Sequence, residues 1–130
     1  MSQFVRLRSA RPCNDLRAIE RFYVDALGCA RLGSFDDHDG FDGLIVGSPD
    51  GAWQVEFVRE RGVIAPDAPT DEHLLVFYVA DRAALAAIEA TLRTAGHATV
   101  KPHNPYWLRH GSTYVDPDGY HVVIAMAPGP

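Results

Sequence analysis

The sequence predicts an α+β fold built from two copies of one β-α-β-β-β module. A Pro-Asp-Gly turn followed by an apolar strand occurs twice, at residues 49–51 and 117–119. An aspartate suited to capping a helix also occurs twice, as Asp15 and Asp81. The capping aspartates are 66 residues apart and the turn prolines are 68 residues apart. This nearly constant offset favours an internal duplication.

The length and composition of the chain favour a single-domain protein and exclude some classes of partner. The 130 residues suit a single domain, with modules at about 4–60 and 72–127 joined by a proline-containing linker at 61–71. The net charge is −5, and without a basic block nucleic acid and membrane surfaces are poor partners. No long apolar run or signal peptide is present, so we expect a cytoplasmic protein with Cys13 and Cys29 as free thiols.

The first module begins with a strand at 4–10, which Arg11-Pro12 ends because proline cannot extend a ladder. Asn14 or Asp15 can cap the following helix, and Gly28 is a suitable stop. The helix has an apolar face of Leu16, Ile19, Phe22, Tyr23, Ala26 and Leu27. Strands are predicted at 29–35, 44–47 and 53–59.

The second module repeats this order. Its first strand, 72–79, is the most hydrophobic of the chain. Asp81 caps a helix with Leu85, Ile88 and Leu92 on one face, and Gly96 ends it. The remaining predicted strands lie at 97–100, 112–115 and 120–126.

Several motifs resemble one known group. Asp15-Leu16 opens the first helix, Leu27-Gly28 ends it, and residues 116–119 read Asp-Pro-Asp-Gly. With Phe22-Tyr23, these motifs resemble the vicinal oxygen chelate superfamily of glyoxalases, bleomycin-resistance proteins and extradiol dioxygenases. The resemblance covers residues 4–127, and a poorly characterised branch shares the motifs at 37–43 and 104–107. It implies one curved mixed sheet with a concave ligand cup, helices outside, and a homodimer.

The resemblance also implies a divalent metal, Zn, Ni, Mn or Fe, held by four side chains. The first position falls on Arg8 and the last on Val123, neither of which ligates a metal. Glu56 matches the second position, and His73 matches the third only with a one-residue slip from Leu74. Glu56 and His73 are therefore the candidate metal ligands of an incomplete site, and we expect weak or absent metal binding.

Both candidate ligands have a plainer interpretation. Glu56 lies in an apolar strand and would need a partner if buried, which Arg8 can supply. His73, near a strand start, can be a capped or solvated histidine. The acidic stretch at 36–43 lacks the alternation of a calcium loop, so a solvated hairpin is favoured there.

The loop at 101–114 is the richest in functional side chains. Aromatic rings supply flat apolar contact for a ligand, while Asn, Arg and His supply polar groups. His110 is the best candidate for a general acid or base, because imidazole titrates near neutrality, and Glu56 is the other candidate catalytic residue. The alternative is an aromatic lid without a ligand. The candidate substrate-binding residues are Arg8, Asn104, Tyr106, Trp107 and Tyr114.

These observations favour a protein that acts on or binds a small organic molecule in the cup. A lyase-like or isomerase-like enzyme needs a metal or an acid–base pair there. A non-catalytic protein that sequesters a drug or metabolite needs only a shaped pocket. A regulatory interaction module, the third alternative, would show a closed cup and a large exposed apolar patch.

Overall fold

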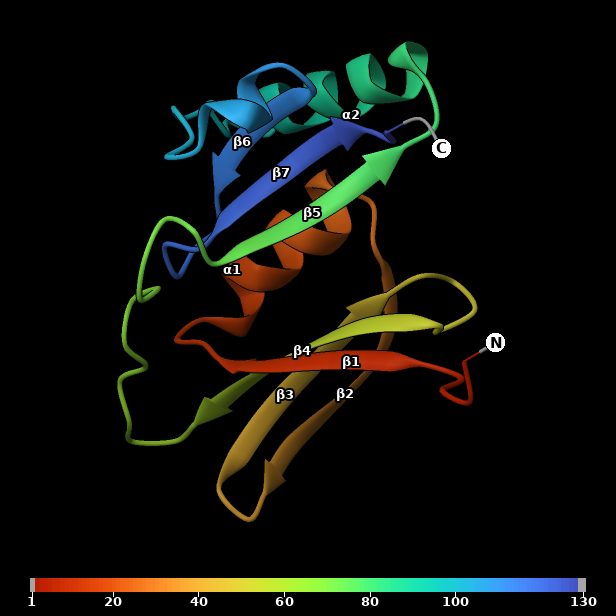
Figure 1. The fold of residues 1–130 in the computed structure, drawn as a ribbon. Coiled ribbons are helices and arrows are strands. Elements are labelled where there is room, and N and C mark those ends of the chain that lie inside the picture. The colour runs from red at the N-terminus through yellow and green to blue at the C-terminus, as the bar shows by residue number, and fades with distance from the viewer. Residues whose placement is uncertain (1, 129–130) are drawn as a thin grey trace. The chain divides into compact units, whose positions relative to one another are not determined.

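The computed structural model describes residues 2–128 and divides into two compact units at Pro66 and Asp67 (Figure 1). The α+β class is confirmed. Hydrogen bonds join the strands into a four-stranded and a three-stranded sheet. None of the helices within residues 2–128 has the length and apolar character required to cross a membrane.

The first unit holds four strands and one long helical segment. Its strands are β1 (Leu7–Pro12), β2 (Ala30–His38), β3 (Phe41–Gly47) and β4 (Trp53–Glu60). The sheet order is β1-β4-β3-β2, with β1 parallel to β4 and the other pairs antiparallel. Because β1 is an edge strand, it tolerates Pro12, which has no N–H to donate. The strand predicted at 4–10 therefore starts three residues too early and ends two residues too early.

The helical segment covers one face of this sheet. It consists of α1 (Leu16–Glu20) and the π-helical η1 (Arg21–Ala26). Asp15 caps it by accepting hydrogen bonds from the N–H groups of Arg17 and Ala18 at 3.0 and 3.1 Å. Tyr23 packs on Phe57 of β4 with 4.7 Å between the ring centroids. The sequence predicted the helix and its cap, but not the wider turn of η1.

Two tight turns set the register of the antiparallel strands. Asp39 and Gly40 both adopt positive φ, 53° and 89°, which joins β2 to β3 as a two-residue hairpin. The predicted Pro49-Asp50-Gly51 turn joins β3 to β4. Asp50 there accepts hydrogen bonds from the Ser48 hydroxyl at 2.6 Å and the Ala52 N–H at 3.0 Å.

The second unit holds β5 (Leu74–Val79), α2 (Arg82–Thr94), the short 3-10 helix η2 (Pro105–Leu108), β6 (Gly111–Val115) and β7 (His121–Met126). Its sheet order is β5-β7-β6, with β5 parallel to β7. Asp81 caps α2 through the Ala84 N–H at 2.8 Å, as predicted. Asp116 closes the last turn by accepting from the N–H groups of Asp118 and Tyr120.

One predicted strand is absent from the second unit. Residues 97–104 form neither helix nor strand, although the Val100 N–H donates to the Thr113 carbonyl at 2.8 Å. Pro102 follows two residues later and has no N–H with which to continue a ladder. The contact with β6 therefore stays a single point, and the second unit is β-α-β-β.

Candidate functional site

The four-stranded sheet has one covered and one open face. The alternation of side chains along each strand places Leu44, Val55 and Phe57 on the covered face, where they are 2%, 4% and 0% exposed. The opposite side is called the open face below. Its residues on β1 and β4 are Arg8, Ala10, Pro12, Gln54, Glu56, Val58 and Glu60.

An ion pair lies on the open face where the sequence analysis placed a metal ligand. Arg8 Nη1 donates to Glu56 Oε1 at 2.8 Å, and Arg8 Nε donates to Gln54 Oε1 at 2.8 Å. The Gln54 amide in turn donates to the Gly51 carbonyl at 3.0 Å. The guanidinium is therefore held by two acceptors, and the predicted pairing of Arg8 with Glu56 is confirmed.

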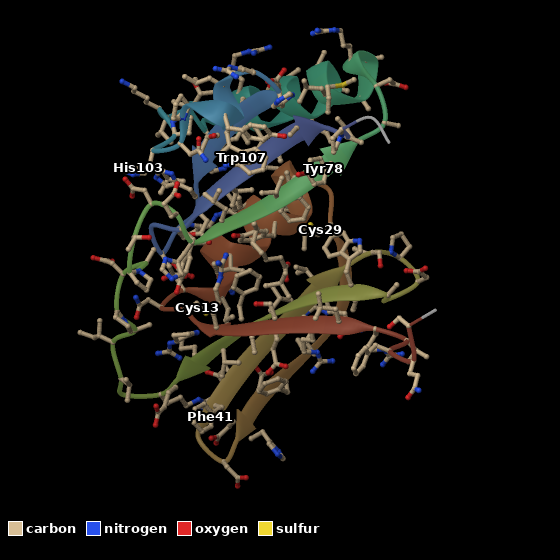
Figure 2. The ribbon with its side chains drawn as sticks, in the orientation of Figure 1. Cys13, Cys29, Phe41, Tyr78, His103 and Trp107 are labelled. Atoms are coloured by element: carbon tan, nitrogen blue, oxygen red, sulfur yellow. The ribbon has the colours of Figure 1, made fainter. Side chains whose placement is uncertain are left out.

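A hollow of about 430 Å³ adjoins the open face at the ends of β1 and β4. Its lining includes Ala10 and Pro12 from β1, Val58 from β4 and Val63 from the following loop. Figure 2 labels two more residues of its lining, Cys13 and Phe41. The sequence analysis missed this feature. The strand alternation that joins Arg8 to Glu56 also places Val58 and Glu60 on the same face.

The acidic hairpin uses one of its aspartates structurally. Asp42 is 6% exposed and lies 2.9 Å from Arg61 Nη2 and 3.2 Å from Arg59 Nη1. The hydrogen bond from Arg61 and the N–H of Asp37 lower the pKa of the Asp42 carboxyl to about 2. The hairpin was predicted as solvated, but Asp42 is not, because two arginines that follow in the sequence fold back onto it.

The second unit presents an aromatic cluster, defined here as Tyr106, Trp107 and His110. The Tyr106 and Trp107 rings meet edge to face with 5.0 Å between centroids, and the His110 ring lies 4.6 Å from Tyr106. Tyr106 is 43% exposed, and Trp107 is half-buried. Figure 2 labels Trp107 in this cluster. The predicted loop thus gathers its rings into one surface feature, which contains the candidate catalytic residue His110.

Two other predicted ligand-binding residues serve the local fold. The Asn104 side chain accepts from the Tyr106 N–H at 3.0 Å and so caps η2. Tyr114 is 2% exposed, and its hydroxyl accepts from Ser112 at 3.0 Å. Burial raises the pKa of the Tyr114 phenol.

The residues at the family metal positions do not fit a divalent metal. Glu56 is already neutralised by the Arg8 guanidinium at 2.8 Å. His73 precedes β5 and is exposed, with its Nδ1 2.9 Å from the Thr70 hydroxyl. Within residues 2–128, no three His, Cys, Asp or Glu side chains gather in a metal-binding arrangement.

A polar feature that the sequence analysis missed lies on the second sheet. Thr113 Oγ1 and His121 Nδ1 are buried and have no hydrogen-bond partner among the residues that the structure describes. Both side chains point to the same face, since Thr113 pairs with Val123 and His121 with Val115. His121 Nε2 lies 3.5 Å from Asp71. A polar group brought to this face would meet two unpaired atoms.

Comparison with family models finds two matches in chain order. Residues 7–58 match a model described as the YycE-like N-terminal domain, and residues 72–126 match the YycE-like C-terminal domain. The uncharacterized protein YycE of Bacillus subtilis (strain 168) is 39% identical over 127 residues. These cover 98% of this chain and 91% of YycE.

Solved structures agree on the fold. A crystal structure of Bacillus subtilis YycE has a TM-score of 0.89 at 40% identity, covering 98% of this chain and 93% of that chain. The trypanothione-dependent glyoxalase I of Leishmania major has a TM-score of 0.74 at 17% identity, with coverages of 97% and 87%. TnmS3, an antibiotic binding protein from Streptomyces sp. CB03234, has a TM-score of 0.68 at 21% identity, with coverages of 98% and 98%.

Proposed function

Because this chain belongs to the YycE-like family of the vicinal oxygen chelate superfamily, we propose that it binds and sequesters a small organic molecule. The proposed site is the open face of the first sheet. The observation that carries the proposal is the Arg8–Glu56 ion pair, which occupies the two metal positions that this sheet supplies. A cation fixed by hydrogen bonds performs no Lewis-acid work, but it does orient a polar ligand group.

The hollow beside the ion pair supports binding rather than catalysis. Its volume of about 430 Å³ lies within the range of small-molecule pockets, and its lining is largely apolar. The structural neighbour TnmS3 is an antibiotic binding protein, and its similar fold supports a binding function, although only at the level of the fold.

The other candidate is a glyoxalase-like lyase or isomerase that uses Glu56 and His110. These residues belong to different units, Glu56 is engaged by Arg8, and the His110 ring contacts the Tyr106 ring at an interplanar angle of 46°. Each unit by itself therefore offers no free acid–base pair at these positions, and the binding function is better supported.

The experiment that separates the two candidates uses protein dialysed against EDTA. A library of small organic molecules is screened by saturation-transfer NMR, and the affinity of each binder is measured by calorimetry. We expect binding without metal, and we expect the Arg8→Gln and Glu56→Gln variants to change affinity while Asp25→Asn, on the exposed side of η1, does not. Binding or turnover that requires added Zn, Ni, Mn or Fe would overturn the proposal.

The aromatic cluster is proposed as a second ligand-contacting surface, which lies within the second unit alone. Trp107→Ala should weaken a ligand bound to this cluster about ten- to a hundredfold, because an aromatic ring contributes about 1–3 kcal/mol by burial. The melting temperature should stay nearly constant. Leu108→Ala is the matched control, since Leu108 lies in the same short helix and is 57% exposed. If Trp107→Ala lowers the melting temperature by several degrees and leaves the affinity intact, Trp107 is a core residue and does not contact the ligand.

We further propose a cytoplasmic homodimer. Two buried cysteine thiols suit a reducing compartment, and many proteins of this superfamily are dimers. Light scattering coupled to size-exclusion chromatography tests the assembly, and a molar mass near 14.3 kDa would contradict it.

A further inference from the structure

The hollow at the ends of β1 and β4 has an uneven lining. Most of it is apolar, contributed by Ala10, Pro12, Phe41, Val58, Val63, Ala65 and Pro66. Phe41 and Val63 are 38% and 51% exposed, so apolar surface continues outward from the hollow. The loop that carries Val63 is anchored, because Asn14 exchanges two hydrogen bonds with the Ala65 backbone at 2.7 and 3.1 Å. The hollow is therefore a built apolar site rather than a gap beside a loose loop.

Two charged residues, Arg11 and Glu60, line this hollow, and the guanidinium of Arg11 points away from it. The Arg11 guanidinium lies 5.3 Å from the centroid of the Phe57 ring and donates to the Tyr23 hydroxyl at 2.6 Å. Phe57 belongs to the covered face. Glu60 is exposed, and no residue within 2–128 forms an ion pair or side-chain hydrogen bond with its carboxylate. The charge that the hollow offers to a ligand is therefore negative.

The other charges on the open face also favour a positively charged ligand. Along β1 and β4, the open face carries Arg8, Glu56 and Glu60, and because Arg8 and Glu56 neutralise each other, one negative charge remains. The whole chain has a net charge of −5, which also disfavours an anionic ligand. The exposed ring of Phe41 adds a face that attracts cations.

We propose that the hollow binds the apolar body of a small organic cation, an aryl- or alkylamine, whose ammonium group pairs with Glu60. This assignment rests on the proposed function, because it names the ligand class for the same open face. Pro12, Val58 and Val63 contact the apolar body, and the ammonium remains partly in water. An exposed ion pair is weak, so the preference for a cation over a matched anion is about three- to tenfold at low salt.

Three probes with one ring system test the ligand class at pH 7. They are 1-naphthylmethylamine, 1-naphthylmethanol and 1-naphthylacetate, which are cationic, neutral and anionic. Titrations of the nitrogen-15-labelled full chain give an affinity for each probe and map the residues whose amide signals shift. We expect the largest shifts at Val58, Val63 and Ala65, and the tightest binding for the amine.

Variants then isolate the charge. Glu60→Gln should bring the affinities of the amine and the carboxylate to within about twofold of each other, while binding of the neutral alcohol is unchanged. Asp25→Asn removes the same charge from the surface of η1 and should preserve the preference. Ala10→Leu, which fills the hollow from an exposed position, should weaken all three probes alike.

The outcomes distinguish this inference from the proposed function. Equal or tighter binding of the carboxylate, or a preference that persists in Glu60→Gln, overturns the cation assignment and leaves small-molecule binding intact. If no probe shifts the amide signal of Arg8, of Glu56 or of any residue of the hollow, the inference fails, and the screen on EDTA-dialysed protein decides the proposed function separately.

Discussion

Single side chains in this protein take their properties from the face of the sheet on which they lie. Arg8 and Arg11 are three residues apart on one strand, yet Arg8 pairs with Glu56 and Gln54 while Arg11 contacts Tyr23 and Phe57. The difference follows from the two-residue period of a strand. Arg8, on the open face, is partly exposed and can contact a ligand. Arg11, on the covered face, packs between the helical segment and the sheet.

Burial likewise sets the chemistry of Cys29, whose pKa is raised to about 12. At pH 8 this thiol is therefore almost entirely protonated, and the side chain is 8% exposed. We expect Cys29 to resist Ellman's reagent in native protein and to react fully in urea. The Cys13→Ser variant leaves Cys29 as the sole thiol for this assay. Fast labelling of that variant without denaturant would contradict the burial.

At the scale of elements, the β2–β3 hairpin is stabilised by the buried side chain of Asp42 and not by the residues of its exposed tip. The carboxylate receives hydrogen bonds from Arg59 and Arg61, and its pKa of about 2 lies below the ordinary value of 3.8. A carboxyl with a depressed pKa in the folded state stabilises the fold above its unfolded pKa. That stabilisation is lost as the pH falls through the folded value.

Asp42→Asn should therefore lower the urea midpoint at pH 7, and the deficit should shrink between about pH 4 and pH 2. Urea titrations of both proteins across this range measure the effect. Asp25→Asn serves as the control, and its difference from the parent protein should stay flat over the same range. A deficit for Asp42→Asn that does not change with pH would mean that its shape, not its charge, supports the hairpin.

The pairing of β6 with β7 depends on a close approach at Gly111. A Cβ atom there would lie 1.8 Å from the Ile124 carbonyl oxygen and 2.7 Å from the Ala125 Cα. Since these are backbone atoms, rotation of a side chain cannot relieve the clash. Gly111→Ala should cost about 1–3 kcal/mol of unfolding free energy, measured in urea.

Gly33→Ala is the control for Gly111→Ala, because its new Cβ would meet only Ile45 Cδ1 at 4.0 Å. This variant should keep its stability within about 0.5 kcal/mol. Equal losses for the two variants would show that general strand propensity, and not the close approach, determines the cost.

At the scale of the whole molecule, the chain offers one tryptophan in each unit. Trp53 begins β4 in the first unit, and Trp107 lies in η2 of the second. The sequence predicts one glyoxalase-like domain over residues 1–130. If the two units fold as one domain, unfolding is two-state and both reporters give the same transition.

Single-tryptophan variants, Trp53→Phe and Trp107→Phe, test this prediction by fluorescence in urea. In each variant, we expect the urea midpoint measured by fluorescence of the remaining tryptophan to equal the midpoint measured by circular dichroism. Transitions that separate within either variant would show that the units unfold independently, and the single-domain prediction would then be wrong.

The sequence by itself determined the features that depend on neighbouring residues. The caps at Asp15 and Asp81, the Pro-Asp-Gly turns and the two helices all involve atoms a few residues apart, so composition and spacing suffice. The duplicated order of these motifs also led to the correct fold family. The strand predicted at 97–100 is absent because its contact with β6 is limited to one hydrogen bond, from Val100 to Thr113, and Pro102 cannot extend the ladder.

Only the tertiary structure decided the candidate site. The Arg8–Glu56 pair was proposed from the sequence as one of two alternatives, and strand register settled it by placing the side chains 2.8 Å apart. The hollow, the clamp around Asp42 and the unpaired atoms of Thr113 and His121 were not foreseen. Each joins residues whose distance depends on register and loop path. A hydrophobic pattern fixes which face a residue occupies, and the long-range pairing of strands fixes what it meets there.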